Sequence, residues 1–331
     1  MAGRVEIHEV ASRLLEDNPL GDSPLRHVPV YVPPGYDAES GRRYPVLYAL
    51  AGFQGSGQSY LNWDWYQPDL PTRLNRLIEG GRMAPVVVVM VDGMTRLGGN
   101  QYVDSSAVGP WARHICEELV PWAERTFRLL PGREHRGVFG KSSGGYGALM
   151  MGLEHADVFA GVASHSGDAY FEYCYGVHFP ATVDTLRALG GLTPFLEQLH
   201  TRPKCPPAWS GALIVVAQAA FYSPNPAAPH GFDLPFVLDT GERREDVLAR
   251  WRERDPVHLV ERHAVALRSL RLLWFDCGTR DEWNLHHGTR LLAARLTAAG
   301  VPHVHEEFDD DHKQVSYRYE VSLPRLAQAL A

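Results

Sequence analysis

The sequence predicts an α/β protein whose central sheet is mostly parallel and carries helices on both faces. Two observations predict this class. Apolar, β-branched runs recur along the chain, and most are continuous rather than alternating, which is typical of strands covered on both sides. Helical patterns lie between these runs, and such alternation of strand and helix indicates an α/β sheet. The expected strands are 27–32, 44–50, 85–91, 136–139, 159–163, 270–275 and 304–308.

Three of the intervening segments show an apolar stripe at helical spacing. They are 107–127, 286–299 and the end of the chain. A stripe on one face is typical of a helix that packs against a sheet. The residues of the stripes are Trp111, Ile115, Leu119 and Trp122, then Leu291, Leu292 and Leu296, and finally Leu323, Leu326 and Leu330.

One connection is far longer than the others. About a hundred residues separate the strand that ends near Ala163 from the strand that starts near Leu270, whereas a crossover needs about a dozen. The segment is rich in proline and aromatic residues, and it would lie over the edge of the sheet where ligands bind in open α/β folds. We therefore expect one domain over 1–331, with a lid or cap insertion at 167–260; a subdomain that only packs at the periphery is the alternative.

Composition excludes several classes of function. The 331 residues carry a net charge of −7, with a pI of about 6.1 and no basic stripe, which disfavours nucleic acid as a partner. No apolar run approaches the ~20 residues of a membrane span, and the first residues do not resemble a signal peptide, so we expect a cytoplasmic protein without a membrane partner. The 16 histidines are scattered and no Cys-x-x-Cys pair occurs, so no metal and no other cofactor is expected. The oligomeric state is not predicted, and a homo-oligomer stays open.

The pentapeptide Gly-Lys-Ser-Ser-Gly at 140–144 carries the strongest chemical signal. It lies where an apolar run gives way to a helical pattern. A serine on such a sharp strand-to-helix turn is exposed to substrate, and the next amide lies at a helix N-terminus, where negative charge is stabilised. The position predicts that Ser142 is a nucleophile. A glycine-rich packing turn is the alternative, because a short motif also arises by chance.

A serine nucleophile needs a base that takes its proton and an acid that orients the base. Asp281 follows the 270–275 strand and a glycine turn, and it is the better candidate for the acid than Asp276, which still belongs to the strand. His312 lies in a loop after the last predicted strand, and we predict that it is the base. The competing histidines belong to the last strand or to the start of a helix; they are His303, His305, His286 and His287.

The tetrahedral intermediate needs two hydrogen-bond donors for its oxyanion. The amide of Ser143 is the first candidate, because it directly follows Ser142 in the strand-to-helix turn. The amide of Phe53 is the second candidate, because small residues surround it at 51–57. A simple glycine-rich turn is the alternative for that loop. For the substrate pocket we expect Gln54, Tyr102 and Tyr170.

These motifs resemble those of one family of enzymes. The chain is similar to the esterase D or "putative esterase" family of α/β-hydrolases, which includes S-formylglutathione hydrolases, feruloyl esterases, enterochelin esterases and mycolyltransferases. The resemblance spans about 26–330 and rests on Leu-Tyr-Ala-Leu-Ala-Gly-Phe (47–53), Phe-Gly-Lys-Ser-Ser-Gly-Gly-Tyr-Gly-Ala-Leu (139–149), Asp-Cys-Gly-Thr-Arg-Asp (276–281) and Asp-His (311–312). It implies the α/β-hydrolase fold, a triad of Ser142, Asp281 and His312, and an oxyanion hole at the amides of Phe53 and Ser143.

The chain departs from the family in two places. Ala51 stands where many relatives carry His or Asp, which leaves the amides of the oxyanion loop available. Three aspartates at 309–311 replace the glycines usual before the histidine, and one of them could contact His312.

The function expected from these residues is that of a serine carboxylesterase, which hydrolyses a carboxylic ester or thioester through an acyl-enzyme on Ser142. The partner is then a small-molecule ester. One alternative is an acyltransferase that passes the same acyl group to an alcohol. Another is a catalytically silent binding module, since a fold alone does not fix a function. The sequence does not identify the ester.

Overall fold

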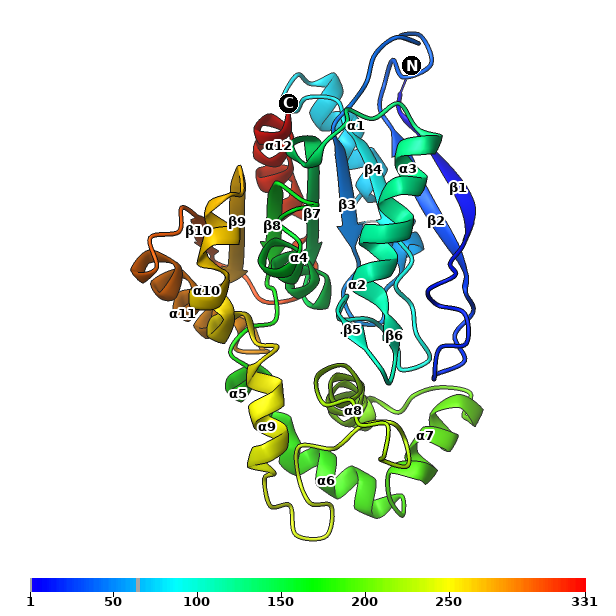
Figure 1. Cartoon of the computed structure of the whole chain (residues 1–331), viewed down its shortest axis with the longest axis vertical. Coiled ribbons are helices and arrows are strands. Elements are labelled where there is room, and N and C mark those ends of the chain that lie inside the picture. Colours follow the sequence, from blue (N-terminus) through cyan, green and yellow to red (C-terminus); the bar gives the residue numbers. More distant parts are fainter. Residues whose placement is uncertain (1, 64–65) are drawn as a thin grey trace.

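The computed structural model describes residues 2–63 and 66–331. Its main element is an eight-stranded sheet with the strand order β1-β2-β4-β3-β7-β8-β9-β10 (Figure 1). Strands β1 and β2 are antiparallel to their neighbours and the other six are parallel, so the prediction of a mostly parallel sheet is confirmed. The strands are β1 (Arg4–Ala11), β2 (Leu25–Val32), β3 (Val46–Leu50), β4 (Val87–Val91), β7 (Arg136–Lys141), β8 (Gly161–His165), β9 (Leu272–Gly278) and β10 (Val304–Phe308).

All seven predicted runs form strands of this sheet, within a few residues at each end. Strand β1 was not predicted, because its charged residues alternate with apolar ones and it forms the outer edge of the sheet. A short ribbon of β5 (Asp104–Ser105) and β6 (Gly109–Pro110) was also not predicted.

Helices cover both faces of the sheet, as expected. Alternate residues of β3 show this: Val46, Tyr48 and Leu50 belong to one hydrophobic cluster, whereas Leu47 and Ala49 belong to the other. The predicted helix 107–127 starts at residue 111 and contains a π-helical turn at 114–119. The helices around the sheet are α1 (Leu70–Glu79), α2 (Trp111–Arg113), α3 (Val120–Thr126), α4 (Ser143–Glu154), α10 (Pro256–Arg268), α11 (Leu285–Ala298) and α12 (Tyr319–Leu330).

The long connection after β8 is mainly helical. Figure 1 shows α6 to α9 gathered beyond one end of the sheet, away from both termini. Helix α8 is apolar all round and buried over 212–222, so it forms the centre of this insertion. The helices of the connection are α5 (Phe171–Cys174), α6 (Phe179–Ala188), α7 (Leu192–Thr201), α8 (Ser210–Tyr222) and α9 (Glu245–Arg252). That 167–260 acts as a lid stays a prediction.

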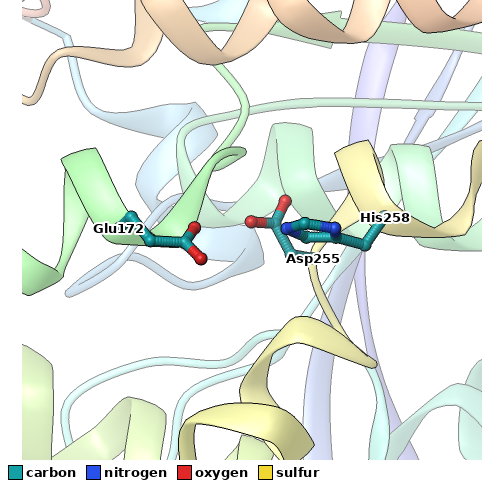
Figure 2. A group of neighbouring side chains, drawn as sticks. All are labelled: Glu172, Asp255 and His258. Atoms are coloured by element: carbon teal, nitrogen blue, oxygen red, sulfur yellow. The ribbon is translucent and has the colours of Figure 1, made fainter. Parts of the chain in front are cut away.

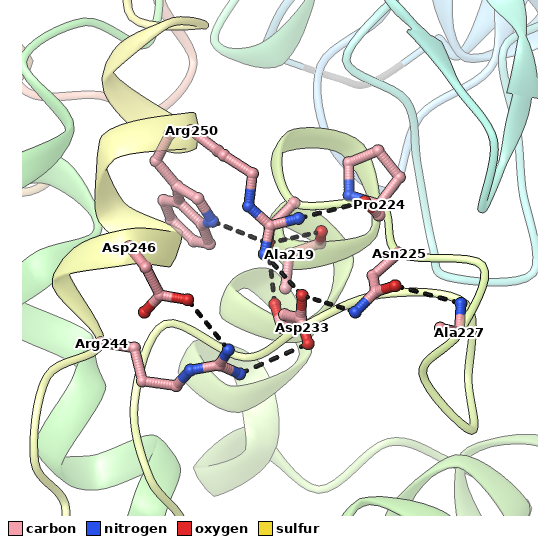
Figure 3. A network of polar contacts seen from close by, with 10 residues as sticks. Ala219, Pro224, Asn225, Ala227, Asp233, Arg244, Asp246 and Arg250 are labelled. Atoms are coloured by element: carbon pink, nitrogen blue, oxygen red, sulfur yellow. Dashed lines mark hydrogen bonds and ion pairs between the residues drawn. The ribbon is translucent and has the colours of Figure 1, made fainter.

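A charged network holds the irregular chain between α8 and α9 (Figure 3). Asp233 accepts hydrogen bonds from Arg250 at 2.5 Å, Asn225 at 3.0 Å and Arg244 at 3.4 Å. Arg250 also donates to the carbonyl of Pro224. Burial opposes ionisation, but these donors hold the pKa of the Asp233 carboxyl below its ordinary value. The network fixes the loop to the start of α9. Among the residues described, no helix has the length and apolar character needed to cross a membrane.

Candidate active site

Ser142 occupies a strained turn between β7 and α4. Its φ of 57° and ψ of −126° lie outside the regions that a residue with a side chain ordinarily adopts. The turn requires glycine on both sides: a Cβ at Gly144 would lie 1.9 Å from the carbonyl oxygen of Leu50, and one at Gly140 would lie 2.4 Å from the oxygen of Gly144. The local sequence therefore forms the sharp strand-to-helix turn that the pentapeptide predicts, and the role of Ser142 as a nucleophile stays a prediction.

The structure brings together the three predicted triad side chains. His312 Nε2 lies 3.1 Å from Ser142 Oγ, and His312 Nδ1 lies 2.8 Å from Asp281 Oδ2. Asp281 also accepts a hydrogen bond from the amide of Trp283. Although burial opposes ionisation, the bonds from His312 and the backbone hold the pKa of Asp281 below its ordinary value. A carboxylate in this position fixes the tautomer of the imidazole and stabilises its charged form.

Asp276, the alternative acid, lies in a separate buried network. Its carboxylate contacts His165 Nδ1 at 2.7 Å and Arg318 Nε at 2.8 Å. His165 Nε2 in turn lies 2.8 Å from Ser322 Oγ, so a second serine, histidine and aspartate meet here. All three are at most 1 % exposed, which leaves no path for a substrate. This group connects β8 and β9 to helix α12.

The aspartates before His312 point to other partners. Asp309 pairs with Arg280, and Asp310 accepts a hydrogen bond from the hydroxyl of Tyr317. Asp311 accepts from the amide of Lys313. Within the described residues, none of them contacts the imidazole of His312, whose carboxylate partner is Asp281. The amide of His312 is held by Glu282 Oε2 at 2.9 Å, a contact that the sequence did not indicate.

Phe53 and Ser143, whose amides are the two predicted oxyanion donors, line one cavity. In the described part of the chain, neither the amide of Phe53 nor that of Ser143 donates to another protein group. The loop around Phe53 is fixed, because Gln54 N donates to the carbonyl of Gly98 at 2.7 Å. It also packs against the strand-to-helix turn: a Cβ at Gly52 would lie 3.5 Å from Ser142 Cβ. Two free, fixed amides beside a nucleophile are what an oxyanion hole requires.

We call the cavity in front of Ser142 the catalytic cavity. Its volume is about 230 Å³. Helix α8 supplies one wall with Ser210, Ile214 and Gln218, so the insertion shapes the space beside the nucleophile. The full lining is Gly52, Phe53, Gln54, Lys141, Ser142, Ser143, Asp168, Tyr175, Ser210, Ile214, Gln218, Trp283 and His312.

Of the three predicted pocket residues, Gln54 lines this cavity, and Tyr102 and Tyr170 do not. Tyr102 is 1 % exposed, and its hydroxyl donates to the carbonyl of Ala51, beneath the oxyanion loop. Tyr170 stacks on Tyr173 instead. Both tyrosines lie on segments that approach the site, but the direction of their side chains could not be predicted from the sequence.

Asp168 is a residue of the catalytic cavity that sequence reasoning missed. Its Oδ2 accepts hydrogen bonds from Tyr175 at 2.7 Å and from Ser143 Oγ at 3.2 Å. Ser143 Oγ accepts in turn from Gln101 Nε2. Burial raises the pKa of Asp168 to about 6. The available signal was its place just after β8, because polar residues at the carboxyl ends of parallel strands converge on one edge.

Glu172, Asp255 and His258 form the one group of three potential metal ligands found within the described ranges (Figure 2). Their ligand atoms lie within 4.8 Å of one another. The oxygens of Asp255, however, already accept from the amides of Tyr170, Phe171 and Val257, and Glu172 pairs with Arg252. Burial raises the pKa of Asp255 to about 7. The bonds of Asp255 join the starts of α5 and α10, and none of the three residues lines the catalytic cavity.

The sheet order and the positions of Ser142, Asp281 and His312, which follow the parallel strands β7, β9 and β10, define the α/β-hydrolase class. A family model described as "Putative esterase" matches residues 24–326. The chain belongs to this family.

Relatives and solved structures agree with this assignment. Esterase Rv1288 of Mycobacterium tuberculosis is 29% identical over 289 residues, which are 86% of this chain and 52% of the relative. An endo-1,4-beta-xylanase/feruloyl esterase of Xylanibacter ruminicola is 27% identical over 144 residues, or 43% of this chain and 19% of that protein. The chain thus spans about half the length, or less, of these curated relatives.

Two solved structures share the fold along nearly the whole chain. A ferulic acid esterase has a TM-score of 0.65 at 18% identity, with 99% of each chain covered. An S-formylglutathione hydrolase of Agrobacterium tumefaciens has a TM-score of 0.57 at 17% identity, covering 100% of this chain and 96% of the other.

Proposed function

We propose that this protein is a serine carboxylesterase that works through an acyl-enzyme on Ser142. The observation that carries the proposal is the continuous hydrogen-bonded series from Asp281 through His312 to Ser142, which ends at an open cavity. A buried carboxylate, an imidazole and a half-buried serine at a cavity supply, in this order, the orienting acid, the base and the nucleophile of acyl transfer.

The geometry gives each residue a step. Ser142 Oγ attacks the ester carbonyl carbon while His312 Nε2 takes the hydroxyl proton, and the carbonyl oxygen becomes an oxyanion. The amides of Phe53 and Ser143 stabilise this charge, each by roughly 3 kcal/mol. His312 returns the proton to the leaving alcohol or thiol as the carbon–oxygen or carbon–sulfur bond breaks. Water, activated by His312, then attacks the acyl-enzyme and releases the acid and Ser142.

The relatives support the reaction class. Those with printed activities are named as esterases, feruloyl esterases or S-formylglutathione hydrolases, so both oxygen esters and thioesters belong in the substrate set to be tested. The absence of a protein partner for the two oxyanion amides, within the described chain, argues against a silent module, because a binding protein has no use for free donors beside an activated serine.

A panel of esters tests the proposal. We expect hydrolysis of nitrophenyl esters graded by acyl length, and feruloyl esters and glutathione thioesters extend the panel to the substrates of the named relatives. Ser142→Ala is expected to lower kcat by ~10⁴- to 10⁶-fold. Added alcohol separates the two acyl-transfer functions: a product that is mainly acid identifies an esterase, and a product that is mainly the new ester identifies an acyltransferase. A Ser142→Ala variant with full activity would contradict both.

A further inference from the structure

Lys141 directly precedes the nucleophile and lies where three cavities meet. It lines the catalytic cavity and also a neighbouring cavity of about 400 Å³, which we call the adjoining cavity. The oxyanion loop residues Gly52, Phe53 and Gln54 line both spaces, so the loop separates them. Lys141 further lines an open groove beside the histidine loop. A substrate arm that extends from Ser142 past the oxyanion loop would therefore reach this lysine.

Within residues 2–63 and 66–331, the ammonium group of Lys141 has no protein partner. Across the described ranges, it forms neither an ion pair nor a hydrogen bond, and its nitrogen is accessible to solvent. Four carboxylates act on its charge without contacting it, and each has other partners. Asp281 binds His312, and Asp168 binds Ser143 and Tyr175. Glu282 accepts from the amide of His312, and Asp311 accepts from the amide of Lys313. Burial lowers the pKa of Lys141 and outweighs these carboxylates, which raise it.

The other charges of the adjoining cavity are already paired or capped. Arg73 contacts Glu320 at 2.5 Å. Asp69 accepts the amide of Thr72 and caps helix α1, whose N-terminus stabilises its charge. Neither Asp168 nor Asp281 lines this cavity. Among the described lining residues, Lys141 is thus the charge that still lacks a partner there, and a cation half-removed from water favours an anion.

We propose that the adjoining cavity is a substrate subsite for a carboxylate, with Lys141 as its counter-ion, so that the preferred esters carry a negative charge away from the scissile bond. The volume fits a small-molecule group. The inference rests on the proposed esterase function and adds its substrate class. The carboxylate lies either on the acyl side of the ester, which we call the acyl arm, or on the alcohol side, which we call the alcohol arm. Pairs of substrates distinguish these two positions.

The test compares charged and neutral esters of matched shape. For the acyl arm, mono-4-nitrophenyl glutarate is paired with 4-nitrophenyl 4-carbamoylbutanoate, in which a primary amide replaces the carboxylate. For the alcohol arm, 4-acetoxybenzoate is paired with 4-acetoxybenzamide. The measured quantity is the charged-to-neutral ratio of kcat/KM within each variant, so that any general loss of activity cancels.

We expect the unmodified protein to prefer the charged ester in one arm, and Lys141→Met to reduce that preference by about tenfold or more, as for a charge-assisted hydrogen bond. Lys141→Arg is expected to retain much of the preference, because its charge is kept. Lys204→Met is the matched control: it removes the same charge from an exposed site and should leave the ratio and the activity unchanged. The arm that responds identifies which side of the ester occupies the cavity.

Two results overturn the subsite: no preference for the charged ester in either arm, or a preference that survives Lys141→Met. The second would mean that Lys141 serves instead as a structural cation beside the acidic histidine loop. Calorimetric binding of the same four esters to the Ser142→Ala variant repeats the test without turnover. Equal affinity of this variant for charged and neutral esters rejects the subsite. Charge-selective binding to the variant, together with no hydrolysis of any ester by the unmodified protein, rejects the esterase function alone.

Discussion

At the scale of single residues, the two aspartates near the end of β9 have different roles because they have different partners. Asp281→Asn should lower kcat by about 10⁴-fold, since an amide favours the wrong tautomer of His312. Asp276→Asn should instead lower the free energy of unfolding by about 3–5 kcal/mol, because Arg318 and His165 lose a buried counter-charge. Turnover measured at equal folded fraction, with urea unfolding alongside, separates the effects. Equal losses of kcat, or a larger one at Asp276, would reverse the assignment.

Asp168 gives the stability of the protein a pH dependence with a definite sign. Its pKa is raised by burial from 3.8 to about 6, so the unfolded chain releases this proton at lower pH than the folded one. The contribution of Asp168 to the free energy of unfolding therefore falls as the pH rises from about 4 to about 6, and it is fully lost above this window. The Asp168→Asn variant lacks this ionisation. Its free energy of unfolding, relative to that of the native protein, should therefore rise by roughly 3 kcal/mol between pH 4 and pH 6.

Denaturant unfolding at pH 4, 5, 6 and 7 measures this difference. Asp184→Asn, at an exposed position of α6, is the control and should give a difference that hardly changes with pH. A constant difference for Asp168→Asn would show that Asp168 ionises normally in the folded state.

At the scale of elements, helix α8 limits the catalytic cavity through Ile214, which is 8 % exposed. Ile214→Ala should shift the preferred acyl or alcohol chain of nitrophenyl and alkyl esters toward longer groups, and Ile214→Trp toward shorter ones. A difference of one methylene in an apolar pocket changes kcat/KM by about 10-fold or more. Val265→Ala, on the exposed face of α10, is the control. A chain-length profile that is the same in all four proteins would exclude α8 from the pocket.

At the scale of the whole molecule, two glycines in the central strands let the last helix pack against the sheet. A Cβ at Gly161 would lie 2.5 Å from Leu326 Cδ1, and one at Gly137 would lie 2.7 Å from Leu330 Cδ1. Gly161→Val should therefore overpack the interface and lower the free energy of unfolding by about 1–3 kcal/mol. Thermal unfolding checks this, with Gly41→Val, which has open space around it, as the control. Equal Tm shifts for the two variants would mean that α12 can move aside freely.

The sheet could be predicted from the sequence because buried parallel strands are continuous apolar runs, whose character does not depend on what packs against them. In the edge strand β1, apolar residues alternate with charged ones, so the segment has no continuous apolar run and was not predicted as a strand. Helix α8 of the insertion was missed because it is apolar all round and has no stripe.

For the site, motif spacing placed Ser142, Asp281 and His312, since each lies at a turn fixed by glycine or by the end of a strand. Side-chain direction had no such signal. Tyr102 therefore lies under the oxyanion loop rather than in the pocket. Ser143 was expected to contribute only its amide, yet its hydroxyl also links Gln101 to Asp168. Contacts of this kind depend on residues far apart in the chain, and only the folded structure joins them.

The most direct test of the account is the site of covalent reaction with an organophosphonate, located by mass spectrometry of the intact protein and of its peptides. The account predicts one adduct per chain, on Ser142, that is absent from Ser142→Ala and strongly slowed in His312→Ala. Ser143→Ala should still be labelled. No adduct, or an adduct that stays when Ser142 is replaced and maps to Ser143, would contradict the nucleophile on which the proposed mechanism depends.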